Sequence, residues 1–95
     1  MTYDLRIHPD ALDYLNTLDN NTKEQLKTKI KVLEDRPKLN RPGADIEKLR
    51  DANPEAYSLR IGKYRAIYRV NNDTVWITDI GLHKIYQRRK KGGKK

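Results

Sequence analysis

The chain has 95 residues, which is enough for one domain, and only 36% of them are hydrophobic, so the core must be small. Lys and Arg number 21 against 13 Asp and Glu, which gives a formal net charge of +8. The absence of cysteine excludes disulfides, a thiolate zinc site and a cysteine nucleophile. No signal-like or membrane-spanning apolar run occurs in the sequence, so we expect a cytoplasmic domain stabilised by packing.

The positive charge is concentrated near the C-terminus. Residues 84–95 contain seven basic side chains and no acid, whereas residues 1–83 are almost neutral. We predict one domain over residues 1–87 and a basic, disordered tail over residues 88–95. Such a tail can bind RNA phosphates in a salt-dependent way that ignores base sequence. Net charge alone therefore does not make the folded part a nucleic-acid binder.

The N-terminal half predicts one strand followed by two helices. Tyr3, Leu5 and Ile7 alternate with polar residues, as in a half-buried strand. A first helix is expected to begin at Pro9, capped by His8. Its predicted apolar face consists of Ala11, Leu12, Leu15 and Leu18.

The second helix is expected to begin at Thr22-Lys23-Glu24-Gln25, which matches the capping-box pattern, after a turn at residues 19–21. Its buried stripe is Leu26, Ile30 and Leu33, and Arg36-Pro37 ends it. The short turn between the helices favours an antiparallel helical hairpin.

The C-terminal half predicts three strands. Residues 37–45 read as an irregular connection, and Ile46 and Leu49 anchor at most a short ordered segment. Strands are expected over residues 57–61, 64–70 and 75–80. The order strand–helix–helix–strand–strand–strand predicts an α+β fold, an antiparallel sheet with the helical hairpin packed on one face and a basic open face on the other.

The first hairpin determines which side chains share the open face. If Gly62-Lys63 is a two-residue turn, Arg60 lies directly opposite Arg65. The core face then carries Tyr57, Leu59, Ile61, Tyr64, Ala66 and Tyr68, and the open face carries Ser58, Arg60, Arg65, Ile67 and Arg69. Two cations across strands repel, so we expect a compensating anion, and the planar fork of arginine suits phosphate. The alternative is that both arginines are solvated and meet acids from loops.

Further candidates surround this pair. Arg69 is expected beside Trp76, where stacking would be structural, and Lys63 at the turn is expected to be a solubilising residue rather than a catalyst. His83 is a candidate general acid or base, since histidine ordinarily titrates near pH ~6.5, and Tyr86 a candidate acid, base or stacking platform. Both are also explained as ordinary surface or packing residues. A lone histidine makes a metal site improbable.

The segment Leu59-Arg60-Ile61-Gly62-Lys63-Tyr64-Arg65-Ala66-Ile67-Tyr68, a hydrophobic strand and then Gly81-x-His83-Lys84-x-Tyr86 together resemble the RelE/ParE toxin superfamily. The element order and length match over essentially the whole chain. This resemblance implies a toxin of a toxin–antitoxin pair. RelE-like members enter the ribosomal A site and cleave mRNA, whereas ParE-like members poison DNA gyrase.

For RelE-like cleavage, the resemblance implies attack of the ribose 2′-OH on the adjacent phosphate without a metal or other cofactor. It assigns phosphate stabilisation to Arg65, a basic strand position to Arg60, and acid/base or base-stacking roles to His83 and Tyr86. The further residues expected to bind RNA are Lys63, Arg69, Lys84, Arg88 and Arg89.

One departure concerns the strand before the hairpin. Some ribosome-dependent cleavers carry two lysines there, where this chain has Ser58 and Arg60. Arginine is a poor base because its pKa exceeds ~12. Deprotonation of the 2′-OH would then fall to His83 or Tyr86, unless ribosomal RNA helps.

The sequence therefore predicts a ribosome-dependent mRNA endoribonuclease toxin, with the ribosome, mRNA and a cognate antitoxin as partners. The antitoxin is expected to cover exposed apolar surface with a helix and to neutralise the cationic face with acids. The alternatives are a ParE-like gyrase inhibitor without nuclease activity and a non-catalytic RNA-binding module. Neither a membrane nor a small-molecule cofactor is expected.

Overall fold

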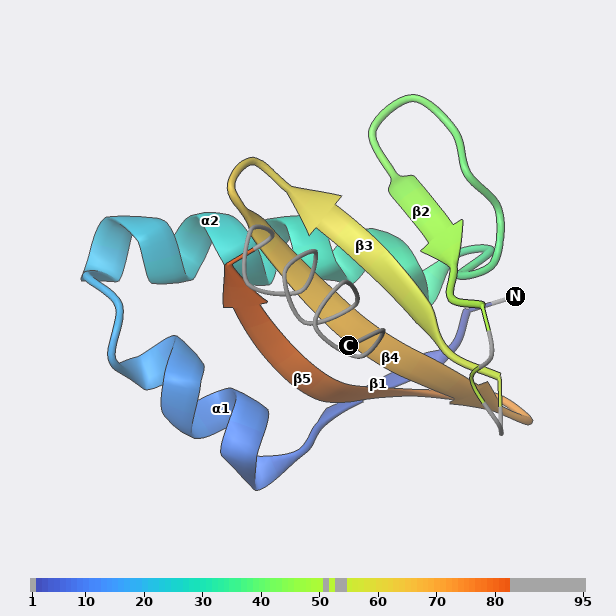
Figure 1. The fold of residues 1–95 in the computed structure, drawn as a ribbon, viewed down its shortest axis with the longest axis horizontal. Coiled ribbons are helices and arrows are strands. Elements are labelled where there is room, and N and C mark those ends of the chain that lie inside the picture. Colours follow the sequence, from blue (N-terminus) through green and yellow to red (C-terminus); the bar gives the residue numbers. More distant parts are fainter. Residues whose placement is uncertain (1, 51, 53–54, 83–95) are drawn as a thin grey trace, which may run out of the picture.

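The computed structural model describes residues 2–50, 52 and 55–82, and these form one sheet with two α-helices on one of its faces (Figure 1). The elements are β1 Asp4–Ile7, α1 Pro9–Asn16, α2 Asn20–Ile30, the short 3-10 helix η1 Lys31–Glu34, β2 Asp45–Lys48, β3 Tyr57–Ile61, β4 Tyr64–Asn71 and β5 Thr74–Leu82. The predicted α+β class is confirmed, as are a strand and two helices before the final three strands. The predicted boundary between residues 87 and 88 lies outside the described residues.

The sheet is mixed rather than entirely antiparallel. Its strand order is β1-β5-β4-β3-β2, and β1 pairs with β5 in parallel while the other pairs are antiparallel. Hairpin turns reverse the chain between β3, β4 and β5, but no hairpin joins β1 to β5, so no turn imposes opposite directions on that pair. The expectation of a purely antiparallel sheet is corrected in this detail.

A fifth strand, β2, forms where the sequence predicted only an irregular connection and a short ordered segment. It pairs antiparallel with β3, so that Ile46 lies opposite Leu59 and is buried. A strand with a single buried apolar residue leaves a weak period-2 pattern, which explains why it was not predicted.

The predicted register of the β3–β4 hairpin is confirmed. Ile61 pairs with Tyr64 and Arg60 with Arg65, and the pairing continues to Tyr57 and Tyr68. Gly62 has φ of +60°, a conformation that a two-residue hairpin turn requires and that glycine adopts without strain. The next pair of strands contains an irregularity near Tyr68, beyond which Arg69 pairs with Trp76 as expected.

Helix caps were predicted correctly at α1 and incorrectly at α2. His8 Nδ1 accepts a hydrogen bond from the backbone N–H of Asp10 at 3.1 Å, which makes it the cap of α1. The cap of α2 is Asp19, whose carboxylate accepts from the backbone N–H of Thr22 at 3.2 Å and from its hydroxyl at 2.6 Å. The cap therefore lies three residues before Thr22 and the helix begins at Asn20, because an aspartate is an equally good acceptor at the cap position. Leu12 is 40% exposed, so the predicted apolar face of α1 is narrower than expected.

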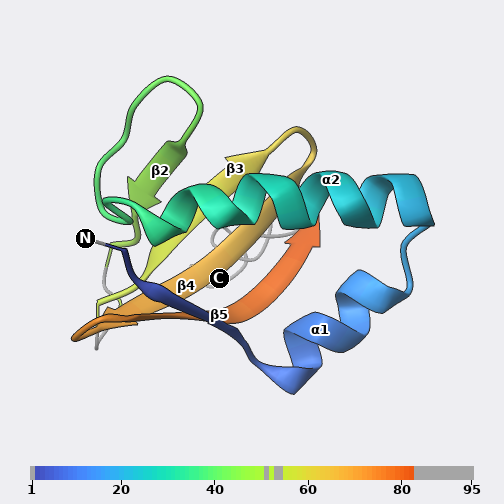
Figure 2. The ribbon, with the colours of Figure 1, turned by 180° about the vertical axis from the view of Figure 1, so that it is seen from behind.

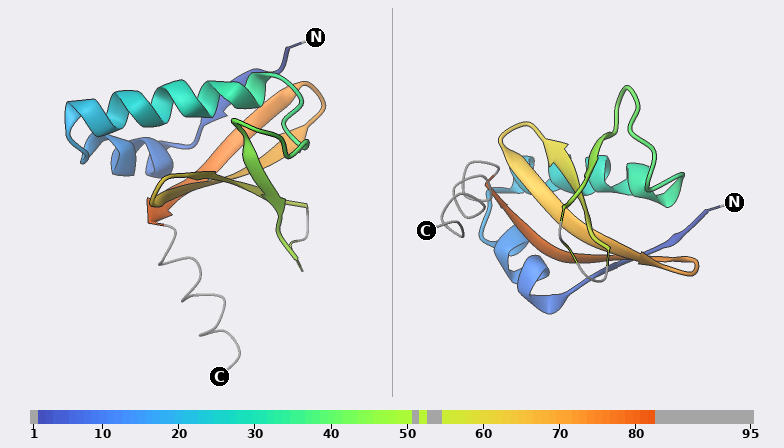
Figure 3. Two further views of the ribbon diagram at one scale, coloured as in Figure 1. Left: turned by 90° about the horizontal axis from the view of Figure 1, so that it is seen from above. Right: turned by 45° about the vertical axis from the view of Figure 1, so that its right-hand side comes forward.

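The core lies between the helices and the sheet. Figure 2 shows α1 and α2 covering one face of the sheet, and Figure 3 shows that the opposite face carries no helix among the described residues. The buried apolar side chains of the helical layer are Ala11, Leu15, Leu26, Ile30 and Leu33, and they pack on Leu59, Ala66, Tyr68, Val75, Ile77 and Ile80. The other face is therefore not covered by any helix among the described residues.

The connection between η1 and β2 is tied to the core by two side chains. The buried hydroxyl of Tyr68 donates to the carbonyl of Pro37 at 2.6 Å, and burial raises the pKa of this tyrosine. The guanidinium of Arg41 donates to four backbone carbonyls, those of Val32, Asp35, Arg36 and Leu39, at 2.6 to 3.2 Å. These bonds satisfy carbonyls at the end of the helix and position the chain for β2.

Candidate functional site

The open face is centred on the cross-strand pair Arg60 and Arg65. Arg60 on β3 is exposed, and its Nε is 3.5 Å from the carbonyl oxygen of Gly62. Arg65 on β4 is only 8% exposed, which is unusual for a residue whose charge cannot be removed. The structure brings the two predicted arginines together, but it buries one of them.

The expected compensating anion is a side chain of the unpredicted strand β2. Glu47 Oε1 lies 3.3 Å from Arg65 Nη1, and the Glu47 side chain is itself 56% exposed. Asp45, two residues earlier on the same strand, pairs in register with Arg60. The alternative of solvated arginines that meet acids from loops is met only in part by Arg65, which pairs with an acid but is buried, and that acid lies on a strand.

This open face is mixed in charge among the described strand residues. The strand registers and their alternation place four acids on it, Asp4, Asp45, Glu47 and Asp79, together with four arginines, Arg6, Arg60, Arg65 and Arg69. The expected excess of positive charge is not found among these residues. The four arginines therefore do not form one broad basic surface, because acids lie among them.

Two buried polar atoms at the centre of the face, Arg65 Nε and Ser58 Oγ, have no hydrogen-bond partner among the residues that the structure describes. Ser58 is 1% exposed and lies between Glu47 on β2 and Ile67 on β4. On the β5 side Arg65 pairs with Gly81, which has no side chain to cover or bond the guanidinium. A buried donor without a partner costs about 1–3 kcal/mol, so a hydrogen-bond acceptor that reached Arg65 Nε would stabilise this cluster.

The remaining predicted residues lie at different places. Lys63 is at the turn, with Nζ 5.8 Å from the ring centre of Tyr64. Arg69 lies beside Trp76 in register, but no cation–π contact joins them in the part of the chain that the structure describes. His83, Lys84, Tyr86, Arg88 and Arg89 lie outside the described residues. The last described residue, Leu82, pairs with Tyr64, so β5 ends beside the hairpin that carries both arginines.

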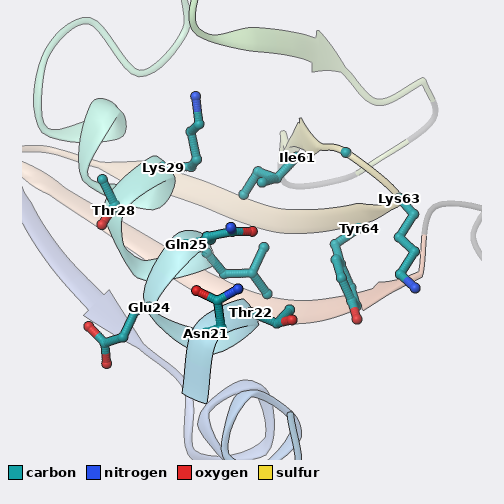
Figure 4. A pocket seen from close by; sticks show the side chains of 11 residues that line it. Asn21, Thr22, Glu24, Gln25, Thr28, Lys29, Ile61, Lys63 and Tyr64 are labelled. Atoms are coloured by element: carbon teal, nitrogen blue, oxygen red, sulfur yellow. The ribbon is translucent and has the colours of Figure 1, made fainter. Parts of the chain in front are cut away.

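Two hollows border the hairpin turn. One, of about 650 Å³, lies between α2 and the turn, and Figure 4 shows Gln25, Lys29, Ile61, Lys63 and Tyr64 around it. The second, of about 640 Å³, is lined by Lys29, the 40–45 segment and Arg60. Only the second reaches one of the two arginines. The first lies on the helical side of the sheet, away from Arg65.

Within residues 2–50, 52 and 55–82, no cluster of three His, Asp or Glu side chains is placed to hold a metal ion. No helix among the same residues is long and apolar enough to cross a membrane.

A family model described as the ParE toxin of type II toxin–antitoxin systems matches residues 5–85. The chain belongs to this family, within the RelE/ParE superfamily of toxins.

Solved structures agree with this assignment. The RelE–RelB complex from Pyrococcus horikoshii is similar at 28% identity and a TM-score of 0.72, covering 86% of this chain and 96% of that one. The isolated E. coli RelE toxin is similar at 25% identity and a TM-score of 0.69, covering 94% and 96%. The YoeB dimer from Staphylococcus aureus, at 20% identity and a TM-score of 0.66 over 87% and 99% of the two chains, shares the fold. A comparison with curated proteins gives no significant match.

Sequence reasoning found both arginines and missed what surrounds them. Glu47 was missed because its strand was missed, although Asp45-Ile46-Glu47-Lys48 does alternate between polar and apolar residues. The buried state of Ser58 was missed because a serine on an open face is normally solvated. The pairing of Glu47 with Arg65 and the burial of Ser58 both result from the pairing of β2 with β3, which a local sequence pattern does not predict.

Proposed function

We propose that this toxin is a ribosome-dependent mRNA endoribonuclease that inhibits translation. The observation that carries the proposal is Arg65, a buried arginine with an unused Nε–H, opposite a second arginine on the open face. Burial holds the guanidinium in one orientation, and such preorganisation is what a site needs to stabilise charge that develops on a phosphoryl group.

The proposed reaction has three requirements. The 2′-oxygen forms a bond to the adjacent phosphorus while the bond from phosphorus to the 5′-oxygen breaks. A base takes the proton of the 2′-OH, and an acid gives a proton to the departing 5′-oxygen. Arg65 stabilises the negative charge on the non-bridging oxygens, and Arg60 on the exposed side of the pair binds the neighbouring phosphate.

The proton-transfer groups are proposed from the resemblance alone. His83 and Tyr86 match the C-terminal positions that supply acid, base or stacking groups in the superfamily. Leu82, the last described residue of β5, pairs with Tyr64 in the hairpin that carries both arginines. Lys63 at the turn, Lys84, Arg69, Arg88 and Arg89 are proposed to bind RNA around the reacting phosphate.

We further propose a cognate antitoxin as the partner that silences the toxin. The RelE structures from Pyrococcus horikoshii and Methanococcus jannaschii are complexes with RelB antitoxins. Acidic antitoxin side chains at Arg60 would block phosphate binding, and an apolar antitoxin helix would cover exposed apolar surface. Arg65 already has Glu47 as a partner, so the exposed Arg60 is the more accessible target of the pair.

A second candidate, inhibition of DNA gyrase without cleavage, is favoured by the match of the ParE family model over residues 5–85. Ser58 in place of a strand lysine is compatible with this alternative. The third reading, an RNA-binding module without catalysis, rests only on the arginines and the basic tail.

Translation in vitro with primer-extension mapping of mRNA breaks separates these functions. We expect breaks in ribosome-bound mRNA only, and their loss when the nucleotide on the 5′ side of a mapped break is replaced by its 2′-deoxy form. Inhibition of gyrase supercoiling with intact mRNA would select the second candidate. Salt-sensitive RNA binding with neither activity would leave the third.

A further inference from the structure

Trp76 on β5 is an exposed aromatic residue on the open face, remote from the Arg60/Arg65 pair. It is 42% exposed, and it is the only tryptophan in the chain. Its position on the open face leaves a large aromatic side chain, with an apolar ring and a polar N–H, available at the surface.

The neighbours of Trp76 in the sheet are cations. Arg69 on β4 pairs with it on one side and Arg6 on β1 pairs with it on the other. Both arginines are exposed, and neither forms an ion pair with any residue that the structure describes. Since adjacent strands lie about 4.8 Å apart, the three side chains form one row across the sheet.

No cation–π contact or aromatic stack involves the indole ring of Trp76 in the described part of the chain. The cation–π contacts there involve Tyr57 and Tyr64, and the aromatic stack involves Tyr57 and Tyr68. Trp76 lines a hollow of about 530 Å³ together with His8, Glu55, Arg69, Asn71 and Thr78. The one acid there, Glu55, already pairs with Lys48 at 3.1 Å, and this hydrogen bond is the main cause of its lowered pKa.

We propose that Trp76, Arg69 and Arg6 form a subsite for single-stranded RNA, in which a nucleobase stacks on the indole and the arginines bind the flanking phosphates. An aromatic platform between cations is the arrangement that binds single strands without sequence preference. The proposal rests on the proposed RNA cleavage and deepens it by adding a second contact along the substrate.

The geometry of β4 places this subsite on the same face as the reaction centre. Arg69 follows Arg65 by four residues, so the two lie about 13 Å apart along the strand. That distance spans more than one nucleotide, so the subsite would hold mRNA beside the cleaved phosphate rather than contact the reacting atoms. Trp76 would therefore be a positioning residue.

The single tryptophan gives a direct assay, since intrinsic tryptophan fluorescence reports on Trp76 alone. Titration of the full chain with a ten-nucleotide oligouridylate should quench this emission in a saturable, salt-dependent way. Arg69→Gln and Arg6→Gln should each reduce the slope of log affinity against log salt by about 1. Lys31→Gln, an exposed lysine of η1 in the helical layer, is the matched control and should leave the slope unchanged.

Trp76→Ala should weaken binding of a fluorescein-labelled oligouridylate by about 5- to 150-fold, measured by anisotropy. Trp76→Phe should restore part of the loss, and Leu39→Ala, which truncates another exposed apolar side chain, should have no effect. Unsaturable quenching, unchanged affinity in Trp76→Ala, or quenching by the antitoxin but not by RNA would each overturn the proposal. RNA quenching without mRNA cleavage would support the subsite and contradict the proposed function, and cleavage without quenching would do the reverse.

Discussion

Glu47 both stabilises and restrains the candidate phosphate-binding arginine, so its replacement should have two opposite effects. Its carboxylate is the partner of Arg65 at 3.3 Å, and it competes with any oxyanion for the same guanidinium. Glu47→Gln keeps a hydrogen-bond acceptor and removes the charge. The prediction is lower stability together with tighter RNA binding.

The magnitudes follow from the burial of the two partners. Glu47 is half exposed, and solvent screening reduces the contribution of the ion pair to stability. Arg65 is buried, however, and in Glu47→Gln it loses its charged partner. We expect the free energy of unfolding to fall by about 1 kcal/mol. Two like charges near 4 Å repel by about 1 kcal/mol even in water, so relief of this repulsion should tighten RNA binding about fivefold.

Urea unfolding and anisotropy with labelled single-stranded RNA measure the two effects. Glu24→Gln is the matched control, because Glu24 is also an exposed glutamate with one ion pair, to Lys27, and it lies on α2 in the helical layer. It should leave RNA affinity nearly unchanged. Weaker RNA binding by Glu47→Gln, or equal effects of the two variants, would refute the reasoning that Glu47 competes for the phosphate site.

Three further predictions concern the fold that positions the site. Tyr68→Phe removes the donor to a buried carbonyl and should lower the free energy of unfolding by about 1–3 kcal/mol in urea. Arg41→Gln removes most of the hydrogen bonds that Arg41 donates to four backbone carbonyls. It should lower the free energy of unfolding by about 2 kcal/mol and speed hydrogen exchange at residues 32–44. Hydrogen bonds from Thr22 to the carboxylate of Asp19 lower the pKa of this group in the folded state. The stability that Asp19 contributes is therefore complete above its unfolded-state pKa of about 3.9, and it is lost as pH falls through the lower folded-state pKa.

Each of these has a control. Tyr14→Phe should be nearly neutral, because the Tyr14 hydroxyl has no hydrogen-bond partner among the described residues. Arg36→Gln breaks only an exposed pair with Asp35 and should cost less than about 1 kcal/mol. Asp19→Asn should flatten the decline of the urea midpoint as pH falls below about 4. An equal loss in Tyr68→Phe and Tyr14→Phe, no loss in Arg41→Gln, or an unaltered pH profile would contradict the respective argument.

The parts of the fold that were predictable are those encoded locally. The β3–β4 register followed from a Gly-Lys turn and from two strands with a clear apolar face. The α1 cap followed from His8 before proline. Strand β2 was not predictable, because its position depends on Arg41 and Tyr68 holding the preceding chain in place. These long-range hydrogen bonds have no sequence pattern.

The candidate site divides in the same way. Alternation and turn geometry were sufficient to place Arg60 opposite Arg65. The burial of Arg65, its pairing with Glu47 and the unpartnered Ser58 depend on a third strand approaching from elsewhere in the chain. The sequence was therefore sufficient to identify the arginine pair, but not the groups that surround it.

The central claim, that Arg65 stabilises the phosphate during mRNA cleavage, is tested most directly by single-turnover cleavage of ribosome-bound mRNA by Arg65→Ala. Antitoxin binding and urea unfolding of the same variant verify that it remains folded, and Arg65→Gln provides a second variant that retains much of the side-chain volume. We predict that cleavage by both variants is slower by a factor on the order of 10²–10³. Cleavage by the folded variants at the wild-type rate would contradict the account.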